Sequence, residues 1–315
     1  MSRRRHRPDT RDLHGILLLD KPLGVSSNKA LQIAMAILRA AKGGHTGALD
    51  PLATGLLPLC FGEATKIAGN LLGSRKAYLA ECRLGATTTT ADLEGEIVVQ
   101  RPVPALDEAA IERALAGFRG RIVQVPPVYS ALKQDGEPLY LKARRGETVQ
   151  APPREVDIHA LQLVSWTPDT LTLHVECGAG TYIRSLAVDL GEKLGCGAHL
   201  TALRRVWVEP FRNPAMVTLD ELREAAERGS GAEQLVLPLA AGVADLPALH
   251  LNAQNGQAVS QGRQIEWPAG QPPARSAAFA GDGRLLALVD CDEQGRMRIL
   301  RGFNLPLPDP AGGGT

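Results

Sequence analysis

The stretch GGHTGALDPLATGLLP, residues 43–58, interrupts the regular hydrophobic patterns on either side of it. It holds four glycines, two prolines and a single carboxylate, that of Asp50. Because glycine permits backbone angles that other residues avoid and proline restricts them, this composition predicts a loop of defined shape. Asp50, which lies between Leu49 and Pro51, is then either part of an ordinary Asp-Pro turn or the acid of a functional site.

The overall composition predicts a globular protein with a substantial core. Of the 315 residues, 44% are hydrophobic and 22% are charged, and this length is typical of two unequal domains. The five cysteines form no CxxC pair, which argues against a disulfide framework or a zinc ribbon and favours the reducing cytoplasm. The basic N-terminus precedes no apolar signal segment, and no hydrophobic run has membrane-spanning length.

Hydrophobic periodicity predicts strands and helices without the regular alternation of a βαβ protein. Ser26 or Ser27, Asp107 and Thr218 are expected to cap helices, and the glycine-rich segment 178–181 to open another. We therefore expect an α+β fold built on a mixed or antiparallel sheet. Its strands are expected at 15–20, 56–61, 76–84, 121–125, 155–166 and 170–177, with further helices at 63–72 and 138–145.

Shifts in composition divide the chain into four parts. Residues 1–12 are basic and are expected to form a disordered arm, and residues 13–245 the main domain. Beyond a glycine-serine stretch and several prolines, short runs separated by turns predict a small β-rich module at 246–308. The proline- and glycine-rich residues 309–315 are expected to be a flexible tail.

The sequence lacks the motifs of several common enzyme classes. The glycine-rich segment 43–47 has no GK[ST] ending, no GxGxxG follows the first strand, and no GxSxG occurs. None of the seven histidines belongs to an HExxH motif or to a Cys/His cluster. We therefore predict neither a cofactor nor a metal site, which leaves carboxylate chemistry as the main possibility.

An aspartate nucleophile must be ionised inside a pocket that excludes water, and burial alone would raise its pKa. Arg184, in the first turn of a mostly apolar helix, is a candidate cation partner, because its charge opposes the helix dipole and needs compensation. The alternative is an arginine paired with another core acid. Tyr78 is either a core residue or a ring that stacks on a base. His45 is either a turn residue or a ligand contact, and Asp92 a cap or a site residue.

Taken together, several motifs from about residue 15 to about residue 211 resemble those of the TruB family, the bacterial tRNA pseudouridine-55 synthases. The C-terminal module resembles the family's PUA-type RNA-binding domain. The motifs are DKPxGxSS (20–27), GHTGxLDPxAxGxLP (44–58), KAY (76–78), GxxTxTxDxxG (85–95), QxPPxYSAxK (124–133), GxGTYIRSL (178–186) and LRR (203–205).

The resemblance implies an isomerase that converts one uridine, position 55 in the T loop of tRNA, to pseudouridine without cofactor or metal. The target base must be flipped out of the folded loop to be reached. By similarity, Asp50 is the nucleophile and attacks either C1′ of the ribose or C6 of the base. Tyr78 would stack on the flipped base and help to remove the C5 proton, and Arg184 would keep Asp50 ionised.

The resemblance also implies a set of substrate-binding residues. Leu203 would line the uracil pocket, His45 would fill the space that the flipped base leaves, and Asp92 would hydrogen-bond near the nucleotide. The two arginines after Leu203, the basic cluster 142–145 and the C-terminal module would contact phosphates. The full set is His45, Asp92, Tyr182, Leu203, Arg204 and Arg205.

The expected partner is the T stem-loop of tRNA, recognised by shape and by single-stranded bases. We expect a cytoplasmic monomer with no membrane association and no obligatory protein partner, which could also assist tRNA folding. Two other interpretations stay open. One is a non-catalytic RNA chaperone. The other is the catalytic subunit of a guide-RNA-dependent complex, but such subunits usually carry lysine-rich tails, whereas this chain ends in a Pro/Gly stretch without lysine.

Overall fold

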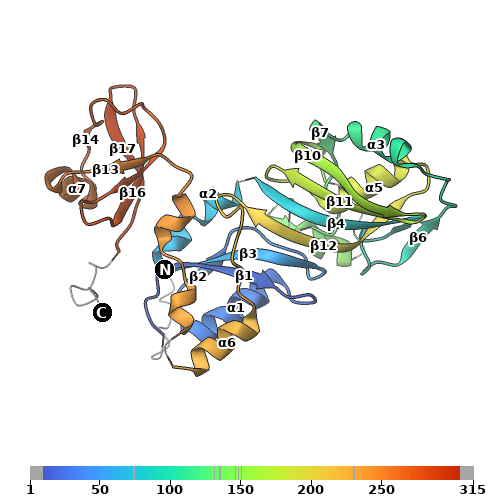
Figure 1. The fold of residues 1–315 in the computed structure, drawn as a ribbon, viewed down its shortest axis with the longest axis horizontal. Helices are drawn as coiled ribbons and strands as arrows, with labels where there is room; N and C mark the ends of the chain where they lie inside the picture. Colours follow the sequence, from blue (N-terminus) through green and yellow to red (C-terminus); the bar gives the residue numbers. More distant parts are fainter. Residues whose placement is uncertain are drawn as a thin grey trace.

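The computed structural model describes residues 10–305, except residues 74, 131, 135, 146, 148, 150 and 230. The molecule is elongated, with a small β-rich module at one end and a broad sheet at the other (Figure 1). The main body holds an eight-stranded sheet and the module a five-stranded one. The body also carries two short hairpins, β5–β6 (Ala86–Thr88, Ile97–Gln100) and β8–β9 (Lys133–Gln134, Glu137–Pro138).

The large sheet has the strand order β1-β3-β12-β4-β11-β10-β7, and β2 pairs with the C-terminal end of β3. Among its described strands, β3 and β12 run parallel and the other neighbours run antiparallel. The α+β class and the mixed sheet are therefore confirmed. The strands are β1 Gly15–Lys21, β2 Gly43–His45, β3 Ala53–Phe61, β4 Lys76–Leu84, β7 Gly120–Gln124, β10 Arg154–Thr167, β11 Thr170–Cys177 and β12 Ala198–Val208.

Strand β12 joins the two halves of this sheet, because it pairs with β3 on one side and with β4 on the other. The close approach of β3 depends on Gly55, whose φ is +93°. A Cβ at Gly55 would lie 2.2 Å from the carbonyl oxygen of Arg205, so any larger residue would push the two strands apart. Because β3, β12 and β4 are neighbours in the sheet, residues from three distant parts of the sequence lie together.

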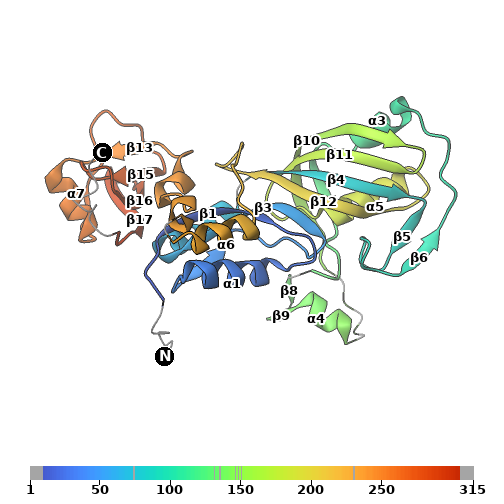
Figure 2. The ribbon, with the colours of Figure 1, turned by 60° about the horizontal axis from the view of Figure 1, so that its bottom comes forward.

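Helices cover the sheet in two groups. Helices α1 (Ser27–Leu38) and α6 (Leu219–Glu227) lie side by side next to β1, whereas α3 (Glu108–Ala116) and α5 (Ile183–Lys193) pack on the other half (Figure 2). The caps Ser26, Asp107 and Thr218 are confirmed, the last as a full capping box with Glu221. None of the described helices combines the length and the apolar character needed to cross a membrane.

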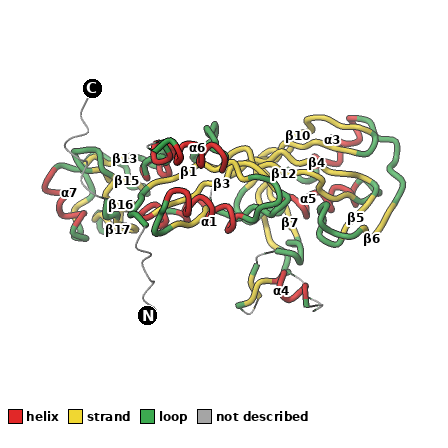
Figure 3. The backbone as a smooth tube through the Cα atoms, turned by 90° about the horizontal axis from the view of Figure 1, so that it is seen from below, coloured by secondary structure: helices red, strands yellow, loops and turns green. Residues whose placement is uncertain are grey.

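Two shorter helical segments differ in how well they match the sequence. The helix expected at 63–72 is divided into a 3₁₀ turn, η1 (Gly62–Lys66), and a short helix, α2 (Ala68–Leu72). Thr65, Ile67 and Gly69 are weak helix formers, which accounts for the interruption. Helix α4 (Leu139–Arg144) forms as expected, and with the β8–β9 hairpin it projects from the body (Figure 3).

The C-terminal module is β-rich, as expected. Its sheet has the order β13-β15-β16-β17-β14, with β13 parallel to β15, and α7 packs against it. Two 3₁₀ turns, η2 (Ala232–Leu235) and η3 (Leu239–Val243), precede it. Its elements are β13 Ala248–His250, α7 Ala253–Ser260, β14 Ile265–Glu266, β15 Ser276–Phe279, β16 Leu285–Cys291 and β17 Arg296–Gly302.

The disordered arm expected at residues 1–12 extends too far, because Arg11 is folded onto the body. The Arg11 amide donates to Arg39 O at 2.8 Å, Arg11 forms a β-bridge with Ala40, and its guanidinium pairs with Glu233. Arg11 therefore belongs to the folded body, because backbone and side-chain bonds both hold it. Residues 1–9 and the expected tail at 309–315 lie outside the described residues.

Candidate active site

A pocket lies where the Asp50 loop, β4, β12 and the start of α5 meet. It is lined by residues far apart in the sequence, because β3, β12 and β4 are neighbouring strands of the sheet. The sequence-predicted site residues that line it are Asp50, Tyr78, Tyr182, Arg184, Leu203 and Arg205. The lining does not include His45, Asp92 or Arg204.

The loop that carries Asp50 is fixed against the start of α1. The amide of Leu49 donates to the hydroxyl of Ser27 at 2.7 Å, and this hydroxyl donates back to Leu49 O at 2.9 Å. On the other side of Asp50, Pro51 O accepts from the amide of Gly24 at 2.9 Å. The backbone on both sides of the aspartate is therefore held by the segment that connects β1 to α1.

A buried lysine, Lys21, supports the same loop from β1. Its Nζ donates to the carbonyl oxygens of Pro22 and Val25, at 2.8 and 2.6 Å, and reaches Pro51 O at 3.4 Å. Burial lowers the pKa of Lys21 to about 8, and the nearby Asp50 carboxylate works against this decrease. Lys21 thus joins the turn after β1 to the loop of the candidate nucleophile.

Arg184 pairs with Asp50, as the sequence predicted. Its Nε lies 3.0 Å from Asp50 Oδ2, and only 6% of the Arg184 side chain is exposed. Nη1 donates to Thr90 O at 3.0 Å and Nη2 to Tyr129 O at 2.8 Å, so all three guanidinium nitrogens are engaged. Arg184 therefore presents its charge to the carboxylate in one fixed orientation.

Asp92 lies behind Arg184 and is 2% exposed. Its Oδ2 is 3.7 Å from Arg184 Nη1, and its Oδ1 accepts from the amide of Glu94 at 3.1 Å and from the hydroxyl of Thr90. Gly95 closes this turn, since a Cβ there would lie 2.5 Å from Thr90 Oγ1. Asp92 is therefore not among the residues that line the pocket, in contrast to the nucleotide contact that the resemblance implies. It is a second carboxylate that holds Arg184.

The electrostatic balance at Asp50 has two opposing causes. Burial raises the pKa of the Asp50 carboxyl, and the positive charge of Arg184 is the main influence in the opposite direction. The net direction is upward, although 45% of the side chain faces the open pocket. The site therefore holds a carboxylate that is less hydrated than a surface aspartate, and the charge of Arg184 favours its ionised form.

Tyr78 and Leu203 lie on neighbouring strands of the pocket wall. Tyr78 of β4 is 7% exposed, and its register partner on β12 is Arg205. Burial raises the pKa of the Tyr78 phenol, and the Arg205 guanidinium, which hydrogen-bonds to it, opposes that increase. An aromatic ring, an aliphatic side chain and an ion-paired carboxylate thus face one cavity, an arrangement suited to holding a planar base beside a nucleophile.

Comparison with known proteins identifies the family. The model described as "TruB family pseudouridylate synthase (N terminal domain)" matches residues 35–183, and "tRNA pseudouridylate synthase B C-terminal domain" matches residues 184–244. A protein named tRNA pseudouridine synthase B from Xanthomonas campestris pv. campestris (strain B100) is 60% identical over 294 residues, which cover 93% of this chain and 95% of that one. The chain belongs to the TruB family.

Another TruB relative gives the same result at a lower sequence identity. The tRNA pseudouridine synthase B of Xylella fastidiosa (strain Temecula1 / ATCC 700964) is 56% identical over 94% of this chain and 97% of its own length. Neither family model extends into the module that begins near residue 246, so its PUA-type character stays a prediction.

Solved structures share the fold. A chain of the "Structure of H/ACA RNP bound to a substrate RNA containing 2'-deoxyuridine" superposes with a TM-score of 0.72 at 24% identity, covering 93% of this chain and 86% of that one. A chain of the "Crystal Structure of a Cbf5-Nop10-Gar1 Complex" gives 0.71 at 24% identity, over 93% and 84%. The pseudouridine synthase fold expected from the TruB resemblance is therefore present.

The two arginines of the TruB-like LRR motif face opposite sides of β12, and neither matches the expectation of a free phosphate contact. Arg205 is 1% exposed and donates from Nε to Leu56 O at 2.7 Å and from Nη2 to Gly47 O at 3.2 Å. Arg204 makes two hydrogen bonds to Asp20, at 2.9 and 2.7 Å. Burial removes Arg205 from the surface, and the paired carboxylate neutralises Arg204.

Tyr182 and His45 occupy different positions relative to the pocket. Gln124 holds the Tyr182 backbone with two hydrogen bonds, and Arg154 lies 5.9 Å from the centre of the Tyr182 ring. His45 is half-buried on β2, its Nδ1 has no partner among the described residues, and burial lowers its pKa. Tyr182 therefore lines the pocket, whereas His45 does not.

Among the pocket residues that sequence reasoning missed are Lys76, Ser130 and Arg154. Lys76 and Ser130 belong to motifs that carry the TruB resemblance, so their motif position was an available signal. Ser130 Oγ is buried without a hydrogen-bond partner among the described residues, although it lines the pocket. No group of three or more potential metal ligands occurs in the part of the chain that the structure describes.

Proposed function

We propose that the chain isomerises a uridine of tRNA, at position 55 in the T loop, to pseudouridine. The observation that carries this proposal is the ion pair of Asp50 and Arg184 in a pocket shared with Tyr78 and Leu203. A carboxylate that stays ionised in a sheltered pocket is what an internal nucleophile requires. The choice of tRNA is supported by the high identity to proteins named tRNA pseudouridine synthase B.

The proposed reaction moves the ribose from nitrogen to carbon on one base. The N1–C1′ bond breaks, the uracil turns, and a C5–C1′ bond forms. The proton on C5 is removed and N1 gains one, so atoms and electrons balance without an oxidant or reductant. Asp50 forms a transient bond to C1′ or to C6 and is regenerated as a free carboxylate in both routes. The base enters the pocket only after it is flipped out of the loop.

The pocket residues have distinct proposed roles. Arg184 stabilises ionised Asp50, and Asp92 positions Arg184. Tyr78 stacks on the uracil and assists removal of the C5 proton, with Arg205 stabilising the phenolate. Leu203 packs against the base. These assignments use groups with restricted side-chain freedom, which lowers the cost of aligning the reacting atoms.

The remaining assignments concern the RNA outside the base. The hydroxyl of Ser130 is available to the flipped nucleotide, because it is buried at the pocket and unpartnered among the described residues. The basic cluster 142–145 projects with α4, and we propose that it contacts phosphates in exchange for the pairs that Arg145 makes with Glu137 and Glu147. We further propose that the protein works as a cytoplasmic monomer on the T stem-loop, without an obligatory protein partner.

The deciding experiment is to map pseudouridine in tRNA after incubation with the purified protein and with its Asp50→Asn variant. The wild type is expected to modify position 55, and the variant to form no product while its affinity for tRNA stays within about twofold of the wild type. Asp220→Asn, which alters an exposed carboxylate of α6, is the matched control and should retain activity. Product formation by Asp50→Asn at the normal rate would exclude Asp50 as nucleophile.

The same assay separates the two alternatives. A non-catalytic chaperone would bind tRNA but leave every uridine unchanged, even in the wild type. A guide-dependent subunit would fail on an isolated T stem-loop until a guide RNA is added. Activity of the pure protein on the stem-loop alone supports the stand-alone enzyme.

A further inference from the structure

The C-terminal module and the body share one apolar core. Ile67 and Leu71 of the body belong to the same buried cluster as Leu288 and Phe303 of the module. Phe303, just after β17, is 6% exposed, and its amide donates to Leu286 O at 2.8 Å. The module is therefore packed onto the body rather than suspended on an open linker.

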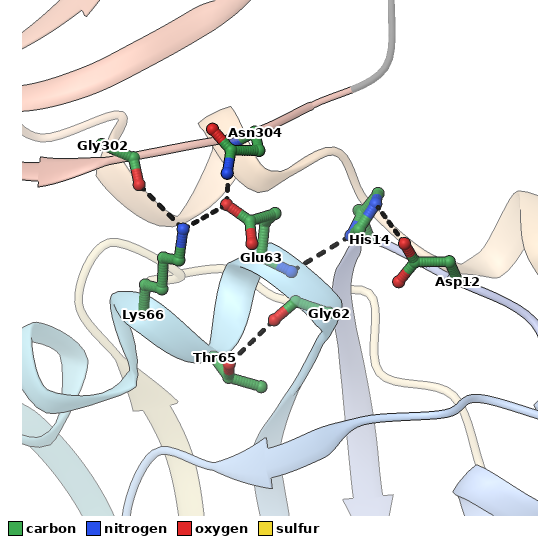
Figure 4. Close-up of polar contacts among 8 residues, drawn as sticks. All are labelled: Asp12, His14, Gly62, Glu63, Thr65, Lys66, Gly302 and Asn304. Atoms are coloured by element: carbon green, nitrogen blue, oxygen red, sulfur yellow. Dashed lines mark hydrogen bonds and ion pairs between the residues drawn. The ribbon is translucent and has the colours of Figure 1, made fainter. Parts of the chain in front are cut away.

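A set of polar contacts lies at the edge of this core (Figure 4). Glu63 of η1 accepts at Oε2 from the amide of Asn304, at 2.7 Å, and from Lys66 Nζ, at 2.5 Å. Lys66 Nζ also donates to Gly302 O at 2.9 Å. We call Glu63, Lys66, Gly302 and Asn304 the module junction. Two body residues thus bind the backbone at and just after the end of β17, Glu63 through its carboxylate and Lys66 through its ammonium group.

The junction is less exposed and has more contacts than an ordinary surface ion pair. The Glu63 side chain is 15% exposed, and the amide of Glu63 donates to His14 Nδ1 at 3.1 Å, which fixes the start of η1. Charged hydrogen bonds to a partly buried carboxylate are stronger than exposed pairs, which contribute little. Apolar packing alone allows a module to rock about its contact, whereas two directional bonds at the edge restrict that rotation.

The module carries cations that are not neutralised within the fold. Arg284, Arg296 and Arg298 each pair with an aspartate of the module. In contrast, Arg263, Arg275 and Arg301 are exposed, and among the described residues no ion pair involves them. Such arginines are suited to phosphate contacts. The module therefore has the chemistry for a second RNA contact, away from the pocket.

We propose that Glu63 is a positioning residue that sets the orientation of the module, so that one tRNA molecule reaches the pocket and the module together. The proposal rests on the proposed function. A second contact on the same rigid body adds affinity without a second loss of rotational freedom, provided that the spacing of the two sites fits the ligand. An isolated T stem-loop fills the pocket alone, so its conversion does not depend on the junction.

The test compares two substrates, full-length tRNA and the isolated T stem-loop, in the wild type and in Glu63→Lys. The new lysine would face Lys66, so both carboxylate bonds are lost and the edge becomes repulsive. We expect kcat/KM on full-length tRNA to fall about tenfold, the equivalent of one charged hydrogen bond, with the loss in KM rather than kcat. Conversion of the stem-loop should stay within about twofold of the wild type. Hydrogen exchange at the Asn304 amide should become faster.

Glu209→Lys is the matched control. Glu209 also accepts a backbone amide, that of Arg75, and pairs with a cation three residues along, Arg212, but both partners lie within the body. This control should not lower kcat/KM for one substrate more than for the other. Glu63→Gln, which keeps an acceptor for the Asn304 amide, should recover part of the loss in kcat/KM. Equal loss on both substrates, or none despite faster Asn304 exchange, would overturn the proposal. If the wild type converts neither RNA, the proposed function fails instead.

Discussion

Arg184 and Arg205 are two buried arginines that line the same pocket, yet their charges have different partners. Arg184 meets two carboxylates, those of Asp50 and Asp92. Arg205 meets backbone carbonyl oxygens and the phenol of Tyr78, and no carboxylate among the described residues pairs with it. One arginine is therefore paired with carboxylates, and the other with the backbone of the pocket wall and a phenol.

This difference predicts that loss of Arg184 mainly affects reactivity and loss of Arg205 mainly affects stability. The charge of Arg184 acts on the ionisation of a carboxylate at the cavity, so its loss changes reactivity. The bonds of Arg205 join β12 to β3 and to the loop at Gly47, so its loss weakens the framework that carries the pocket. Four substitutions or measurements follow from this contrast.

The largest expected effect is on turnover in Arg184→Gln. The variant keeps a hydrogen-bonding group but removes the charge beside Asp50, and we expect kcat to fall by about 10²–10³, the cost of losing one preorganised electrostatic contact. Thermal unfolding and tRNA affinity serve as controls for folding. A variant that keeps more than half of the wild-type kcat would show that Asp50 does not need this cation.

The second effect is on stability in Arg205→Met. The methionine fills much of the space but leaves Leu56 O and Gly47 O without donors, and we expect a loss of about 3 kcal/mol in the free energy of unfolding. The neighbouring Arg204→Met removes a half-exposed pair with Asp20 and should cost about 1 kcal/mol or less. Denaturant titration of both variants measures the contrast. Equal losses would contradict the structural role of Arg205.

The third effect is on the pH dependence of catalysis. Burial raises the pKa of Asp50 and Arg184 opposes this, and the reaction needs the ionised carboxylate. Activity should therefore be present above the pKa of Asp50 and disappear as pH falls through it. In Arg184→Gln the opposing charge is gone, so the acid limb of kcat/KM should move to higher pH. Arg184→Lys, which keeps the charge, should move it less. An unchanged or lower limb in Arg184→Gln would contradict the electrostatic coupling.

The smallest effect is expected for Ser130→Ala. Loss of one hydroxyl that contacts the nucleotide should lower kcat/KM by about fivefold, the value of a single neutral hydrogen bond. Stability should not decrease, because Ser130 Oγ has no partner among the described residues to lose. Steady-state kinetics and thermal unfolding, measured on the same preparation, test both statements. Wild-type kinetics in Ser130→Ala would remove this residue from the binding site.

The sequence predicted the chemistry of the Asp50 side of the pocket well. A carboxylate in a glycine-rich loop and an arginine in the first turn of an apolar helix each lack local compensation, and each compensates the other. That argument depends only on charge and solvation, so it holds across the 134 residues (184 minus 50) that separate the pair. The strand boundaries were also close, because alternating burial is a local property.

The positions of the two arginines in LRR were predicted less well, for a physical reason that the sequence does contain. Successive residues of a strand face opposite sides of the sheet, so Arg205 shares the face of Leu203 and Arg204 does not. Treating 204–205 as one basic cluster overlooked this alternation. The burial of Asp92 and the module junction could not be predicted, because each depends on contacts between segments whose relative placement no local pattern encodes.

Strand β12 has a consequence for biosynthesis. It spans Ala198–Val208, yet it lies between β3 and β4, which are made more than a hundred residues earlier. Until it emerges from the ribosome, the growing chain carries two unpaired strand edges, and such edges are templates for aggregation. Truncated chains that stop before residue 198 should therefore be insoluble as well as inactive. The protein is committed to nearly two-thirds of its synthesis before its pocket can close.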